Sequence, residues 1–127
     1  MYRLSVTATT DASGDATVYL PAAADTLSAA VTGRVLCFIY SKTDFDNGVD
    51  ITVTSEATGQ AIVTLTNQNA SGTFYPRVPV QDETGADATL DGTRKMREPV
   101  YLVNDRIKIV VAAGGNAKTG TFKSIVG

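Results

Sequence analysis

The chain has 127 residues, a formal net charge of −2 and a pI near 4.9, which is the size of one domain with its own core. An acidic balance argues against a protein that neutralises nucleic-acid phosphates, because that task normally requires a strong basic excess. Histidine is absent, and with it the side chain best suited to proton transfer near neutral pH, so we expect neither an enzyme nor a cofactor.

The apolar runs are short. The longest, Val35 to Tyr40, covers six residues, whereas a helix that crosses a bilayer needs ~20. Met1 is followed by alternating sequence and not by a charged start and an apolar stretch, so we expect no secretory signal and no membrane partner. Cys37 is the only cysteine and lies inside the apolar run, which predicts a buried, unreactive thiol.

The N-terminal part alternates apolar and polar residues with a period of two, as strands with one buried face do. Leu4, Val6 and Ala8 share one face of a first predicted strand, and the turn "DASGD" leads to a second strand that Pro21 ends. The stretch "AAADTLSAA" lacks an apolar stripe and is expected to be a connection.

The middle of the chain carries the most apolar predicted strand. "GRVLCFIYSK" is apolar on both faces, which predicts a central strand covered on both sides. The alternation of residues 49–54 predicts the next strand, and "SEATGQ" turns it into "AIVTLT" as the clearest hairpin in the chain.

Residues 73–98 are long, polar and interrupted by proline and glycine. Compact domains seldom carry such loops without a purpose, so we predict an extended arm or a loop that contains a short hairpin. Strands follow in "PVYLVND", "RIKIVV" and "GTFKSIV". About eight short strands with turn residues between them predict an all-β, single-domain antiparallel β-sandwich over residues 1–127, with a jelly roll as one arrangement.

The segment "AAGGNAKTG" resembles a phosphate-binding loop. That loop requires G-x-x-x-x-G-K-[ST] followed by a helix, yet Ala112 and Ala117 occupy the glycine positions and "GTFKSIVG" alternates like a strand. We therefore expect no nucleotide site and interpret residues 113–119 as the loop of a final β-hairpin.

The segment "DFDNGVD" gathers three aspartates around Gly48 and suggests a calcium site. The spacing does not match an EF-hand, because Phe45 and Thr43 occupy ligand positions. An Asn-Gly turn is the preferred interpretation, and a looser calcium site is the alternative. Other acidic turns are explained by turn propensity, so no metal or catalytic site is predicted.

The predicted arm has an acidic first half and a basic second half, a polarity that suits orientation against a complementary protein surface. It also carries aromatic and arginine residues, which anchor interfaces, although the first aromatic could equally belong to the core. The alternative is a solvated loop. The candidate docking residues are Phe74, Tyr75, Arg77, Arg94, Lys95 and Arg97.

On the stretches "YSKTDFDNGVDITVTSEATGQAI" and "NDRIKIVVAAGGNAKTGTFKSIVG", the chain resembles small proteins encoded among the head genes of tailed bacteriophages. It is also similar in size and strand content to capsid decoration, or cement, proteins. The resemblance implies a virion protein, made in the host cytoplasm, that binds the major capsid protein on the outside of the assembled head and stabilises it.

Such a protein would be a dimer or trimer on a local symmetry axis. The alternative function is a tail-associated or carbohydrate-binding β-sandwich module, since small sandwiches also serve that purpose.

Overall fold

The computed structural model describes residues 1–22 and 30–127, and every regular element in these two ranges is a β-strand. The connection predicted at residues 22–30 lies almost wholly outside the described residues. In chain order the strands are β1 (Tyr2–Thr9), β2 (Ala16–Leu20), β3 (Val31–Lys42), β4 (Asp50–Ser55), β5 (Ala61–Leu65), β6 (Gly72–Phe74), β7 (Val78–Pro79), β8 (Arg97–Glu98), β9 (Tyr101–Asp105), β10 (Ile107–Ala112) and β11 (Thr119–Val126).

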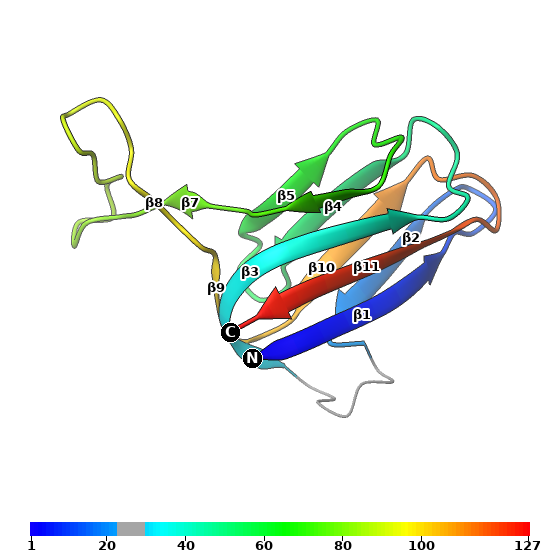
Figure 1. Ribbon diagram of the computed structural model, residues 1–127, viewed down its shortest axis with the longest axis horizontal. Helices are drawn as coiled ribbons and strands as arrows, with labels where there is room; N and C mark the ends of the chain where they lie inside the picture. Colours follow the sequence, from blue (N-terminus) through cyan, green and yellow to red (C-terminus); the bar gives the residue numbers. More distant parts are fainter. Residues whose placement is uncertain (23–29) are drawn as a thin grey trace.

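Two antiparallel sheets pack face to face and form a sandwich (Figure 1). One sheet has the strand order β1-β11-β3-β6, with β9 also paired to β3, and the other has the order β2-β10-β4-β5. This is the order of a jelly roll, in which the chain repeatedly crosses from one sheet to the other. The predicted all-β antiparallel sandwich is confirmed.

The core lies between the sheets and is filled from alternate positions of the strands. Leu4 and Ala8 of β1 are buried, as their shared face predicts. At one end of the core, four stacked or tilted aromatic rings with centroids 5.4 to 6.4 Å apart fill the space. One of these rings belongs to Phe45, so the segment "DFDNGVD" closes this end of the core with its aromatic side chain.

The expectation that β3 is covered on both sides is wrong in part. β3 is central, between β11 and the strands β6 and β9, but on its outward face Ile39 is only half-buried and Arg34 is exposed. The sequence pattern misleads because the strand contains a bulge. Val35 and Cys37 pair with neighbouring residues of β11, and Leu36 is the extra residue between them. The bulge interrupts the alternation, so the strand appears apolar on both faces in the sequence.

One of the two predicted hairpins is confirmed, and the other is wrong. β4 and β5 pair directly across their turn, which confirms that hairpin. The predicted final hairpin is wrong, because β10 pairs with β2 and β4 whereas β11 pairs with β1 and β3, and residues 113–119 carry the chain between sheets. Turn residues show where a chain bends, but they do not determine which strands pair.

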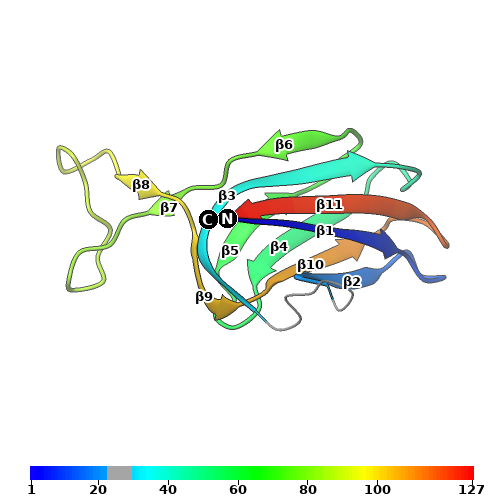
Figure 2. The same cartoon turned by 60° about the horizontal axis from the view of Figure 1, so that its bottom comes forward.

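β6 and β9 together occupy one edge of the first sheet. Phe74 at the end of β6 lies opposite Phe38, the Val100 carbonyl accepts a 2.8 Å hydrogen bond from the Val35 N–H, and β9 continues along β3 from there. The edge strand is therefore interrupted, and residues 75–99 leave the sheet in the gap as an arm that projects from the sandwich (Figure 2). The prediction of an arm is confirmed.

A buried carboxylate anchors the end of β9. Asp105, 5 % exposed, accepts hydrogen bonds from the amides of Ala57 (3.0 Å) and Arg106 (2.7 Å) and from the Ser55 hydroxyl. It thereby joins the β4–β5 turn to the corner between β9 and β10. Three hydrogen-bond donors at this corner therefore share one carboxylate as their acceptor.

Asp105→Ala should lower the free energy of unfolding by about 3 kcal/mol, because a buried hydroxyl and buried amides lose their acceptor. Urea denaturation followed by circular dichroism measures this. The matched control is Asp50→Ala, which removes a carboxylate that accepts an exposed 2.9 Å hydrogen bond from the Asn67 amide. Equal losses in the two variants would contradict an anchoring role for Asp105.

Candidate docking arm

The arm is held together by main-chain hydrogen bonds in a closed ring. β7 and β8 form its stem. Beyond the stem, the N–H of Val80 donates to the carbonyl of Met96 (2.9 Å), the N–H of Met96 to Ala88 (3.0 Å) and the N–H of Ala88 to Val80 (2.7 Å). Two loops, residues 81–87 and 89–95, branch from this ring, and each is closed by an isolated bridge. The arm is therefore ordered without a core of its own.

An aspartate organises each loop. The Asp82 carboxylate accepts hydrogen bonds from the Thr84 amide (2.8 Å), the Thr84 hydroxyl (2.6 Å) and the Ala86 amide (3.2 Å). The Asp91 carboxylate accepts from the amide of Arg94 (2.9 Å). Aspartate favours such turns because its short side chain reaches the amides two to four residues ahead. The structure therefore agrees with the interpretation that these acidic residues serve the turns.

These hydrogen bonds also shift the acidity of the two aspartates. The hydroxyl and amide of Thr84 lower the pKa of Asp82, and the amides of Arg94 and Thr93 lower the pKa of Asp91, because each hydrogen bond stabilises the ionised carboxylate. Both side chains are exposed, so the ionisation of these two aspartates affects the order of their own loops.

The candidate residues near the base of the arm differ in role. Phe74 is half-buried and packs against the core, which supports the core alternative for this residue. Tyr75 is 67 % exposed. Arg77 is exposed and donates to the carbonyl of its neighbour Pro76 at 2.9 Å. Of these three residues, Tyr75 and Arg77 are therefore the ones exposed to a partner.

The basic candidates lie on the second loop and the stem. Arg94 pairs with Asp91 and Lys95 pairs with Asp87, each at 2.9 Å. Arg97 is exposed and makes no ion pair within the described part of the chain. The two charged halves of the arm therefore neutralise each other in part, and the six candidates do not form one cluster.

Sequence reasoning missed the apolar surface of this region. Exposed large apolar side chains gather between residues 75 and 103, where Leu90 and Met96 lie on the arm and Tyr101 and Val103 lie on β9. The sequence does contain a signal for Leu90 and Met96, because a leucine and a methionine within a long polar loop are far from the apolar strands that form the core. Nothing in the alternation of β9 shows which of its faces is solvated.

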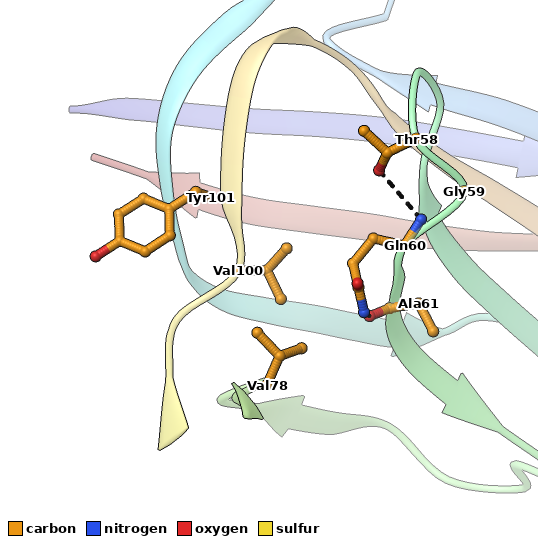
Figure 3. Close-up of a pocket in the computed structure, with 7 residues that line it drawn as sticks. All are labelled: Thr58, Gly59, Gln60, Ala61, Val78, Val100 and Tyr101. Atoms are coloured by element: carbon orange, nitrogen blue, oxygen red, sulfur yellow. Dashed lines mark hydrogen bonds between the residues drawn. The ribbon is translucent and has the colours of Figure 1, made fainter. Parts of the chain in front are cut away.

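A notch of about 610 Å³ lies between the base of the arm and the sandwich. Figure 3 shows Val78 and Val100 facing the β4–β5 turn, where the Gln60 amide donates to the Thr58 hydroxyl at 3.2 Å, and the Tyr101 ring turned outward. A second hollow of about 280 Å³ shares Gln60 and Val78 with it and continues along the arm.

The phosphate and calcium interpretations find no support in the geometry. The amide of Thr119 donates to Asp44 at 2.6 Å, so a carboxylate lies where a phosphate would bind, and β11 follows in place of a helix. Asp46 lies against Gly115, and Asp50 accepts from the Asn67 amide. Within residues 1–22 and 30–127, no group of three or more His, Cys, Asp or Glu side chains could hold a metal ion.

Comparisons with protein-family models, with curated proteins and with solved structures give no match to this chain. In the ranges that the structure describes, no helix has the length and apolar character needed to span a bilayer.

Acid should loosen the arm before it unfolds the sandwich. Because the pKa values of Asp82 and Asp91 are lower in the folded protein, their stabilisation is complete above the unfolded value of about 3.9 and is lost as the pH falls through the folded values. NMR spectra between pH 5 and pH 2 should show the amide signals of Thr84, Ala86 and Arg94 shifting, while the amide signals of buried core residues such as Ile109 and Phe122 stay in place.

Asp82→Asn is the matched control for the first loop, because the amide oxygen still accepts hydrogen bonds but does not titrate. In this variant the Thr84 and Ala86 signals should become insensitive to pH, while those of the second loop still move. Simultaneous changes in the arm and the sandwich would contradict the prediction.

Proposed function

We propose that this protein is a bacteriophage capsid decoration protein, which binds the major capsid protein on the outer surface of the assembled head and stabilises it. The observation that carries the proposal is the projecting arm: an ordered hairpin beyond the sandwich, with Tyr75, Leu90 and Met96 exposed on it. Exposed aromatic and apolar side chains on a projecting segment can supply the apolar contacts of a protein interface. Its place in the virion rests on the resemblance to head-gene proteins.

Stabilisation would follow from linkage. A protein that binds only the mature shell lowers the free energy of that state by RT ln(1 + [L]/Kd) at each site, and many lattice positions add up even where each interface is modest. The rigid sandwich would hold the arm across the junction between neighbouring capsid subunits. We expect a dimer or trimer on a local symmetry axis.

The arm should be necessary for this binding. Pro79 and Arg97 lie directly opposite each other in the stem, so residues 80–96 can be replaced by Asn-Gly, which closes a two-residue hairpin. The shortened protein should keep the stability of the sandwich and should not cosediment with mature capsids of its phage. Intact cosedimentation would show that the arm is not the docking element.

A point variant gives a sharper test. Leu90→Asp should weaken capsid binding about tenfold, a loss of about 1.4 kcal/mol, because it places a charge at an apolar contact. Thr17→Asp, on the exposed outer face of the other sheet, is the matched control and should bind like the unaltered protein.

A glycan panel assayed with the same preparations addresses the alternative. Tyr75 and Tyr101 are exposed aromatic side chains of the kind that sugar sites offer. A saturable glycan hit, together with no binding to mature or immature capsids, would replace the decoration proposal by a carbohydrate-binding or tail-associated module.

A further inference from the structure

We infer that the free edge of β9 is a binding site for an extended peptide segment of a partner protein, which adds as a further strand and places a basic side chain against the base of the arm. This site is separate from the arm's outer loops. It does not require that the partner be a capsid protein, so this inference and the decoration proposal can fail independently.

The main chain of β9 supplies the first argument. In an antiparallel pair, alternate residues direct their N–H and C=O groups to opposite sides. Val100 and Asn104 direct theirs toward β3, because the Val100 carbonyl accepts from Val35 and the Asn104 N–H donates to the Thr32 hydroxyl at 2.9 Å. The polar groups of Tyr101 and Val103 therefore point away from β3, the only described strand that pairs with β9.

The side chains of β9 supply the second argument. Tyr101 is 56 % and Val103 is 75 % exposed, whereas Leu102 between them is buried. Natural proteins protect an edge strand with lysine, proline, a bulge or a covering loop. A register shift beside Asn104, whose φ is 48°, bounds this edge at one end, and Pro99 bounds it at the other, so the stretch open to a further strand is residues 101–103. The aromatic and β-branched side chains of Tyr101 and Val103 are well suited to pair with such a strand.

The charges around the notch determine the kind of peptide. Among the described residues, no charged side chain lines the notch itself, whereas the second hollow, which shares Gln60 and Val78 with it, is lined by Asp87 and Glu98. Asp87 is neutralised by Lys95, whereas Glu98 is half-buried and has no ion-pair partner in the described ranges. A lysine or arginine of the peptide would complement Glu98, and apolar residues at alternate positions would cover Tyr101 and Val103.

The test uses the full chain and a soluble synthetic probe, acetyl-Ser-Lys-Val-Thr-Val-Lys-Val-Thr-Ser-amide, in an NMR titration to millimolar concentration. The amides of Tyr101, Val103 and Gln60 should shift on saturation, and those of Tyr101 and Val103 should become protected from hydrogen exchange. The same peptide with alternate main-chain nitrogens methylated keeps its side chains but loses donors, and it should not bind.

Two variants locate the site. Val103→Lys introduces the natural edge protection and should weaken probe binding about tenfold, whereas Thr7→Lys, exposed on β1 at the opposite edge of the sheet, should have no effect. Glu98→Gln should weaken binding about threefold, the size expected for one solvent-accessible ion pair.

Absence of shifts at Tyr101 and Val103, or equal binding of the methylated peptide, would overturn the inference. Protection of these amides that rises with protein concentration in the absence of peptide would also overturn it, because the occupant of the edge would then be a second copy of this chain.

Discussion

The pairing of β3 with an interrupted edge strand is the constraint on which the rest of the structure depends. β3 is held by β11 on one side, and on the other side it pairs first with β6 and then with Val100 and β9. The bulge at Leu36 lies in the stretch of β3 where its edge partner changes. Because both halves of the edge are hydrogen-bonded to the same strand, the arm between them leaves from a rigid base.

The arm and the sandwich are stabilised by different physical means. The sandwich buries apolar side chains between two sheets, and its corner at Asp105 satisfies polar groups with one carboxylate. The arm has almost nothing to bury, so a ring of main-chain hydrogen bonds and the turns organised by Asp82 and Asp91 keep it ordered. Its apolar side chains remain exposed and available to a partner, while acid should affect it before the core.

Two surfaces of distinct chemistry result from this division. The loops of the arm offer isolated apolar side chains among charges that are partly paired within the arm. The edge of β9 offers main-chain donors and acceptors beside the notch, and the carboxylate of Glu98 lines the neighbouring hollow of about 280 Å³. The first surface suits contact with a folded partner, and the second suits an extended segment. Binding at one of them does not require the other.

The fold class, the single sandwich and the arm could be predicted because they follow from local signals: period-two alternation, turn residues and a long polar stretch with prolines. The buried thiol of Cys37 was also predicted, from its place in an apolar run. The core role of Phe45 was not predicted. The docking role of the candidate residues stays a prediction. The arm was correct, but Phe74 belongs to the core, and Arg94 and Lys95 are engaged by the aspartates that precede them in the loops.

The sequence by itself determined that the chain forms strands with one apolar face and where those strands bend, since both properties depend on neighbouring residues. Only the tertiary structure decided which strands pair. "AAGGNAKTG" joins two strands whether they form a hairpin or enter different sheets, and the choice depends on which partners bury the faces of β10 and β11. For the same reason, the exposure of Tyr101 and Val103 could not be predicted from the sequence, because it depends on the position of β9 at the edge of its sheet.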